Sequence, residues 1–398
     1  MNKKILSLLI LLIITPCLMA QKKELSQARS DIKNNRNLAQ TEKLLSELSA
    51  DSIYKLNPDV YLLWYQSVLK QYEVGNEKLY LKQKYDTAAM YSMTKKMFDI
   101  LMKLDTIDAT PNNKGKIKIR FRKKHSEKLN ILRPNLFFGG AFYIHKGDYQ
   151  NAFNLYDIYL KTFSHPMFED YQYCKTDTNM YHTAYLTTYC GYMLNKPNIT
   201  LKYSDIALLD SVHNRYVIQY MAEAYKLEGN TDQYIKTLSK GFNKYPNHSY
   251  FFPRLNDYYI SKGMPQKALE MSNKALEADS LSILFLYAKS TLLLNLGRYD
   301  ESINVSDKII SLNDTLPEPY YNAGMAWMNK VYQLEDEKNT VGYKNKLLNI
   351  YRKAMPYIER YRVLSPKDKD NWAPILYKIY FNLNMGKKFD EIDKIITK

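Results

Sequence analysis

Apolar residues recur at intervals of three and four through most of this chain, the spacing that gathers them on one side of an α-helix. Short breaks containing glycine, asparagine or proline separate these stretches. The pattern therefore predicts an all-α protein in which helices follow one another through short turns and pack by their apolar sides.

Part of this pattern repeats at a fixed distance. Gly229, Gly263 and Gly297 stand 34 residues apart, and the same kinds of residue precede each of them. A tyrosine or leucine comes four residues before the glycine and a compact residue comes seven before it. These places hold Tyr225, Tyr259 and Leu293, and Ala222, Asn256 and Ser290. A period of this length with helical spacing is typical of stacked helical hairpins.

The repeat resembles the tetratricopeptide repeat (TPR) family, in which a compact residue, an aromatic residue, a glycine and two alanines recur in this order. Ala268 and Ala275 occupy the alanine positions of one unit. The best matches are residues 135–166, 215–248, 249–282 and 283–316. The resemblance implies a TPR-like α-solenoid, a right-handed superhelix of helical hairpins, and a role in binding other proteins.

Three segments are expected along the chain. Residues 1–20 begin with lysines followed by an apolar run, the pattern of a secretory signal peptide. Residues 21–134 predict irregular helical hairpins, and residues 135–398 predict the TPR-like repeats. We therefore expect an exported protein, periplasmic or associated with the outer membrane, and cleavage after Ala20. A lipid anchor on Cys17 is the alternative.

Several further hairpins are predicted outside the regular frame, with turns at glycine, asparagine or proline. The expected pairs are 24–33 with 38–48 about Asn35, 60–72 with 79–104 about Gly75, 178–194 with 199–211 about residues 195–198, and a last hairpin that turns at Gly386.

The chain is basic, with a net charge of +16 that falls to +14 without residues 1–20. Most of this charge is scattered, as on solvated helix faces. One cluster stands out, since it contains no acidic residue: Lys114, Lys116, Lys118, Arg120, Arg122, Lys123 and Lys124. It predicts either docking to an anionic envelope lipid or glycan, or an extended connection whose apolar residues Ile117, Ile119 and Phe121 are tucked in.

A binding wall is predicted from the resemblance, because TPR proteins use the inner side of their first helices. The corresponding positions include Tyr216, Gln219, Glu223, Tyr250, Tyr287, Thr291, Tyr321 and Met325. Aromatic, methionine and mixed polar residues suit contact with a protein or peptide. The lysine and asparagine pattern of TPR proteins that clamp a C-terminal carboxylate is not present.

Motifs for catalysis, cofactors or metals are not found. None of the six histidines has another within four residues, and no phosphate-binding glycine loop or nucleophile-elbow serine occurs. An oxidising compartment would permit a bridge between Cys174 and Cys190, but we expect two isolated, buried thiols. We expect a non-catalytic scaffold with a protein or peptide partner, and neither nucleic acid nor a small-molecule substrate. A cryptic α-solenoid enzyme is the remaining alternative. The sequence does not identify the partner.

Overall fold

The computed structural model describes residues 23–111, 115–335 and 342–397, and all regular secondary structure in these ranges is helical. The predicted all-α class is therefore confirmed. The chain divides into two compact units between Tyr234 and Ile235, inside helix α12 (Thr231–Lys244). This division does not coincide with the predicted change from irregular to regular hairpins at residue 134. The predicted signal peptide and Cys17 lie outside the described residues.

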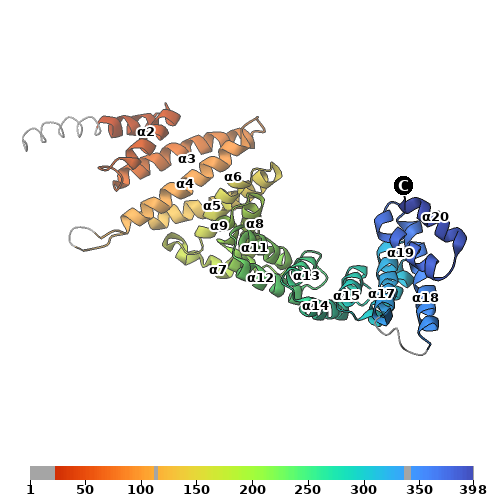
Figure 1. Cartoon of the computed structure of the whole chain (residues 1–398). Coiled ribbons are helices and arrows are strands. Elements are labelled where there is room, and N and C mark those ends of the chain that lie inside the picture. The colour runs from red at the N-terminus through yellow and green to blue at the C-terminus, as the bar shows by residue number, and fades with distance from the viewer. Residues whose placement is uncertain (1–22, 112–114, 336–341, 398) are drawn as a thin grey trace, which may run out of the picture. The chain divides into compact units, whose positions relative to one another are not determined.

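The first unit is a succession of helices of very different lengths. It contains a helix over residues 23–33, then α2 (Leu38–Ala50), α3 (Pro58–Tyr80), α4 (Thr87–Asp108), α5 (Arg122–His145), α6 (Tyr149–Lys161), the 3₁₀ helix η1 (Pro166–Tyr171), α7 (Tyr173–Thr176), α8 (Met180–Met193), α9 (Pro197–Leu201), α10 (Ser204–Ala207) and α11 (Asn214–Leu227). From α2 to α6, each helix packs on the next one in the sequence (Figure 1).

The second predicted hairpin turns later than expected. Helix α3 runs unbroken through Gly75, and the chain reverses before α4. A Cβ atom at Gly75 would lie 2.5 Å from the ring of Tyr85 and 2.6 Å from the sulfur of Met90. This glycine therefore permits close packing instead of forming the turn. The first hairpin is as predicted, with Asn35 in a left-handed conformation at φ 51°.

The hairpin of α5 and α6 shows both uses of glycine. Gly147 lies between the two helices at φ 72°, a conformation that glycine enters without strain. Gly140 lies inside α5, where a Cβ atom would be 2.3 Å from the ring of buried Tyr156 on α6. The two helices can cross closely because that side chain is missing.

The predicted helix over residues 199–211 is wrong, since this stretch forms two short helices, α9 and α10. The chain bends between them at Lys202 and Tyr203. The side chains of both residues donate hydrogen bonds to Asp157 of α6, at 2.5 and 2.8 Å. Burial raises the pKa of the Asp157 carboxyl, but these bonds and one from Lys161 outweigh burial and leave the pKa below its usual value.

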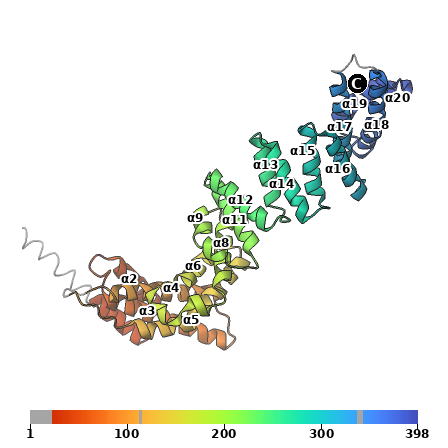
Figure 2. The ribbon, with the colours of Figure 1, turned by 90° about the horizontal axis from the view of Figure 1, so that it is seen from below.

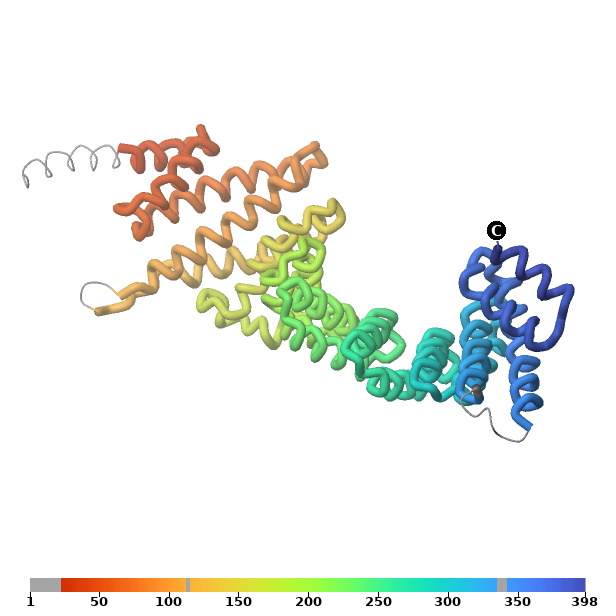
Figure 3. Tube along the Cα trace, in the orientation of Figure 1, coloured from red at the N-terminus to blue at the C-terminus, as the bar shows by residue number. Residues whose placement is uncertain are grey.

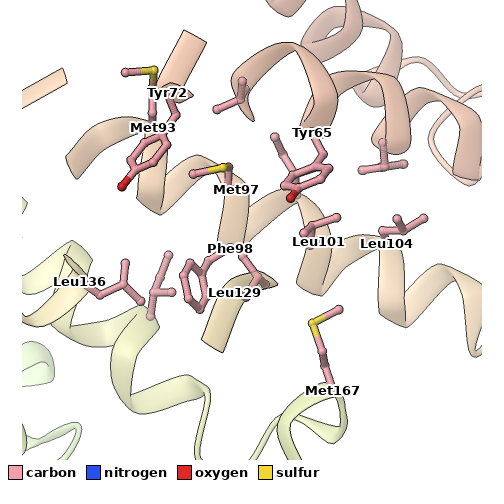
Figure 4. Close-up of a cluster of buried hydrophobic side chains, with 14 of the residues drawn as sticks. Tyr65, Tyr72, Met93, Met97, Phe98, Leu101, Leu104, Leu129, Leu136 and Met167 are labelled. Atoms are coloured by element: carbon pink, nitrogen blue, oxygen red, sulfur yellow. The ribbon is translucent and has the colours of Figure 1, made fainter. Parts of the chain in front are cut away.

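The core of the first unit lies between α3, α4 and α5. Met97, Phe98, Leu101 and Leu104 form one side of α4 and are completely buried. Complete burial of a large apolar side chain contributes about 1.5–3 kcal/mol to folding. Figure 4 shows these residues facing partners on the neighbouring elements, namely Tyr65 and Tyr72 of α3, Leu129 and Leu136 of α5, and Met167 of η1.

The second unit is more regular. It contains most of α12 and then α13 (Phe251–Ser261), α14 (Pro265–Ala278), α15 (Ile283–Asn295), α16 (Tyr299–Leu312), α17 (Pro317–Glu335), α18 (Tyr343–Leu364), α19 (Lys369–Asn382) and α20 (Gly386–Ile396). From α13 to α20, each helix packs on its successor (Figures 2 and 3). Such nearest-neighbour packing is the defining property of a solenoid.

The predicted glycine turns are confirmed in the repeats. Gly263 and Gly297 have φ values of 66° and 75°, and Gly229, between α11 and α12, has 70°. The residue after the glycine donates its backbone amide to the carbonyl that lies four residues before the glycine. Around Gly263, for example, the amide of Met264 donates to the carbonyl of Tyr259 at 2.8 Å. This hydrogen bond closes the first helix in a Schellman motif.

The last hairpin uses asparagine for its turn. Asn384 has φ 54°, whereas Gly386, the predicted turn residue, is the first residue of α20. Lys378 occupies a place on α19 where the repeats have an apolar residue. Its ammonium group lies 4.1 Å from the centre of the Tyr332 ring, a cation–π contact that accommodates the charge.

Candidate functional site

The predicted wall is best developed on two first helices of the second unit. Leu284, Tyr287 and Thr291 stand at spacings of three and four on α15, and therefore on one face. Leu284 is 46% exposed and Tyr287 is 38% exposed, although both are large apolar residues. Helix α17 packs on α15 and carries the half-buried Tyr321 and Met325. We call these five residues the α15–α17 wall.

A buried polar network fixes the base of this wall. The amide nitrogen of Asn322 donates to Ser290 Oγ at 3.1 Å and to Thr291 Oγ1 at 3.0 Å. The hydroxyl oxygens of Ser290 and Ser306 are 2.7 Å apart, and Ser302 donates to the backbone carbonyl of Ser290 at 2.9 Å. These contacts connect α15, α16 and α17. They satisfy polar groups that would otherwise be costly to bury.

One predicted wall residue belongs to the core. Tyr250 is only 6% exposed, and its ring makes an edge contact with Phe251 at 5.3 Å. The guanidinium of Arg254 lies 3.8 Å from the centre of the Tyr250 ring. Tyr250 precedes α13 and folds back against it, so it does not offer its ring to a partner.

The other three predicted wall residues lie in the first unit. Tyr216, Gln219 and Glu223 are half-buried on α11, at the spacings of three and four that share one helix face. The guanidinium of Arg215 lies 5.0 Å from the centre of the Tyr216 ring. The eight predicted residues are therefore divided between the two units, and five belong to the second.

Two arginines of the basic segment are held in ion pairs that its sequence does not indicate. Arg122 makes two hydrogen bonds with Asp105, both at 2.8 Å, and Arg120 pairs with Asp108 at 3.0 Å. Both carboxylates are almost completely buried at the C-terminal end of α4. The hydrogen bond with Asp105 raises the pKa of Arg122 further. These two arginines join α4 to the start of α5. Lys114 lies outside the described residues.

Two apolar residues of this segment are exposed, which contradicts the expectation that they are tucked in. Ile117 is 58% exposed and Ile119 is 41% exposed, and only Phe121 packs against the core. Lys118 is exposed between the two isoleucines, while Lys123 and Lys124 are exposed in the first turn of α5. The segment over 115–120 therefore presents alternating cationic and apolar side chains at the surface.

A buried arginine was not predicted. The side chain of Arg133 on α5 is 8% exposed and lies between the rings of Tyr159 and Tyr173, 3.8 Å from each centre. It donates to Asp177 at 2.5 Å and to Thr162 at 2.9 Å. Burial also raises the pKa of the Tyr173 phenol, to about 12. The arginine lines a pocket of about 300 Å³.

The sequence contains a signal for this arginine. Leu129 and Leu136 are completely buried and lie four residues before and three residues after Arg133, so all three share one helix face. A charged residue on an apolar face must have a partner in the core. Because the partner Asp177 follows α6 and η1 in the chain, only the fold brings the two together.

Cys174 and Cys190 are both free thiols, but the expectation that both are buried is wrong for Cys174, which is exposed, and holds for Cys190. Burial raises the pKa of the Cys190 thiol to about 12, so this thiol stays protonated at neutral pH. Among the described helices, none has both the length and the apolar character required to cross a bilayer.

No family model and no curated protein sequence matches the chain. Solved structures do match. One is the C-terminal part of a TPR repeat-containing protein from Cytophaga hutchinsonii, with 14% identity, a TM-score of 0.42, and coverage of 65% of this chain and 93% of that one. Another is a TPR repeats protein from Bacteroides fragilis, with 20% identity, a TM-score of 0.32, and coverage of 66% and 98%. A third is YrrB, described as a TPR protein with an unusual peptide-binding site, with 14% identity, a TM-score of 0.35, and coverage of 50% and 92%.

The repeats of this chain have their own diagnostic features. Hairpins recur with a 34-residue period, left-handed glycines close their first helices, and small residues such as Ala268 and Ala275 are completely buried between helices. These are the features that the resemblance predicted. The helical-hairpin repeats that the resemblance implied are therefore present in the described residues.

Proposed function

We propose that this chain is an exported, non-catalytic scaffold that binds a protein or peptide through the α15–α17 wall, within a complex of the cell envelope. The observation that carries the proposal is the exposure of Leu284 and Tyr287 side by side on α15. Tyrosine is enriched among the residues that contribute most of the binding energy at the centre of a protein interface. YrrB is described as having a peptide-binding site, and we include a peptide among the proposed ligands of this chain for that reason.

The arrangement of the wall suits an extended or helical peptide. Thr291 contributes a hydroxyl group beside the apolar pair, while Tyr321 and Met325 continue the surface on α17. Tyr321 is partly engaged already, because its ring lies 5.1 Å from that of Tyr361. Leu284 and Tyr287 are therefore the residues to replace in a test, since both are more exposed than Tyr321.

The test uses a photo-cross-linking amino acid placed at position 287, in the protein expressed in its own cells. We expect a specific cross-linked species at this position. The control is Leu312, an apolar residue of the same unit that is 42% exposed but lies at the end of α16. Equal cross-linking at positions 287 and 312, or none at 287, would contradict the proposal.

A second experiment measures affinity for the cross-linked partner. The variant Leu284→Ala/Tyr287→Ala should bind more weakly by roughly 30-fold, which corresponds to the loss of about 2 kcal/mol at a tyrosine hot spot. Leu312→Ala should bind as the unchanged protein does. Circular dichroism should show equal helix content in all three proteins.

The exposed isoleucines favour a second candidate function, docking on an anionic envelope surface. Ile117 and Ile119 alternate with lysines in residues 115–120, and this combination suits the boundary between lipid headgroups and acyl chains. Ile117→Ser/Ile119→Ser should reduce co-sedimentation with phosphatidylglycerol vesicles. Ile131→Ser, at an isoleucine 73% exposed on α5, should not. Unchanged sedimentation of the double variant would remove this candidate.

A further inference from the structure

Two histidines and an aspartate from two separate parts of the chain converge in the first unit. His182 lies in the first turn of α8, whereas Asp210 and His213 lie between α10 and α11. Each residue offers one ligand atom, and these atoms all lie within 4.8 Å of one another. The expectation of no metal site depended on histidines close together in the sequence, and it does not apply to residues that the fold brings together.

The spacing of these atoms is that of metal ligands. The Oδ2 atom of Asp210 is 3.0 Å from Nδ1 of His213 and 3.5 Å from Nδ1 of His182. Zinc binds imidazole nitrogen and carboxylate oxygen at about 2.0–2.2 Å, so two ligands of a tetrahedral ion are separated by about 3.3 Å. The two distances from Oδ2 lie on either side of this value, and the three ligand atoms all lie within 4.8 Å of one another.

The carboxylate is held in a fixed orientation. Its Oδ1 atom accepts hydrogen bonds from the backbone amides of Val212 and His213, at 2.9 and 3.0 Å. The Oδ2 atom is thereby directed toward the two imidazole rings. Asp210 is itself buried, with 8% of its surface exposed.

The imidazole rings are supported as well, and they remain accessible. The ring of Tyr185 stacks on that of His213 with centres 4.1 Å apart, and the ring of His182 lies 6.3 Å from that of Phe137. The side chains of His182 and His213 are 40% and 28% exposed. An ion and a water molecule can therefore reach the cluster from solvent.

We infer that His182, Asp210 and His213 form a binding site for a divalent transition-metal ion of the zinc class. The ligands are the Nδ1 atoms of the two neutral imidazole rings, which then carry their proton on Nε2, and Oδ2 of Asp210. Two imidazoles with one carboxylate suit Zn²⁺ better than Ca²⁺ or Mg²⁺, which prefer oxygen ligands alone. Three protein ligands leave the fourth position to water.

Metal binding would join two elements that pack together in this unit. Helix α8 contributes one ligand, and the turn that leads into α11 contributes the other two. The ion would therefore stabilise this part of the first unit. This inference does not depend on the proposed partner-binding wall, which lies in the second unit.

The experiment titrates the purified, untagged chain with Zn²⁺ by isothermal calorimetry, after treatment with a chelator. We expect one tight site per chain. His182→Gln and His213→Gln should each lower the affinity at least tenfold. His145→Gln removes an exposed imidazole at the end of α5, away from the cluster, and should leave the affinity unchanged. Circular dichroism checks that every variant is folded.

A second measurement reports the ligands directly. Co²⁺ in place of Zn²⁺ should give the strong visible absorption of a tetrahedral site, and both glutamine variants at the cluster should abolish it. The inference is overturned if the unchanged chain binds no stoichiometric Zn²⁺. It is also overturned if His182→Gln and His213→Gln bind Zn²⁺ as tightly as His145→Gln does.

Discussion

Replacing Arg133 with methionine should destabilise the first unit strongly. The change removes the guanidinium that neutralises Asp177 at 2.5 Å, and that carboxylate is 8% exposed. Removal of one partner from a buried ion pair costs about 3–5 kcal/mol. The methionine sulfur can contact the rings of Tyr159 and Tyr173 in place of the cation, which restores about 1 kcal/mol. The expected net loss is about 3 kcal/mol.

The companion change Asp177→Asn shows whether the pairing itself causes this loss. Asparagine can still accept the hydrogen bond that Tyr159 donates at 2.6 Å, but it carries no charge. The double variant Arg133→Met/Asp177→Asn should therefore be more stable than the sum of the single effects indicates. A coupling of at least about 1.5 kcal/mol is expected for a buried pair.

Hydrogen exchange is the appropriate assay, because opening of α5 and α6 can be measured apart from the rest of the chain. The control is Arg298→Met. Arg298 makes an exposed ion pair with Glu301, and such solvent-screened pairs contribute little to stability. The reasoning is refuted if Arg133→Met changes the opening free energy no more than Arg298→Met does. The reasoning is also refuted if the destabilisation of the double variant equals the sum of the Arg133→Met and Asp177→Asn effects.

Three further changes test other parts of the fold. Burial raises the pKa of the Asp157 carboxyl, but three hydrogen-bond donors hold this pKa below its usual value. The carboxylate therefore contributes stability above the pKa of the unfolded chain, and this stability is lost as the pH falls through the folded pKa. Asp157→Asn should cost about 2 kcal/mol at neutral pH and less in acid, measured by urea unfolding at several pH values. Gly191→Ala would place a Cβ atom 2.3 Å from the backbone nitrogen of Thr200, so α8 and α9 must separate. We expect the opening free energy of these helices, measured by hydrogen exchange, to fall by about 1–3 kcal/mol. An unchanged opening free energy would show that the two helices are loosely packed. At Gly263 a Cβ atom meets nothing within 4 Å, so Gly263→Ala should cost only the left-handed conformation, about 1 kcal/mol in thermal unfolding, and a larger loss would indicate an unrecognised contact.

The sequence predicts the regular repeats well because their turns have a local cause. Gly263 must adopt a positive φ at the end of a helix, and its apolar neighbours show helical spacing on both sides. Gly75 appeared similar in sequence, yet it lies within a helix because Tyr85 and Met90 pack against it. A glycine that makes a turn and one that permits close packing have the same local pattern, so only the packing partners distinguish them.

The candidate sites were predicted less well, because their partners are distant in the chain. Tyr287 was predicted to line the wall from its repeat position, and its side chain is 38% exposed. Tyr250 has an equivalent position but folds into the core, which repeat position alone does not show. His182 and His213 lie on different elements, and the only local signal was Asp210 three residues before His213.

The hydroxyl and amide groups beneath the α15–α17 wall have a mechanical consequence. Helices that meet only through aliphatic side chains can slide or roll over each other at little cost, but the bonds from Asn322 to Ser290 and Thr291 have fixed directions. A small shift of α17 along α15 would break both. The surface of α15 and α17 is therefore a rigid template, and a bound protein or peptide must adapt its conformation to it.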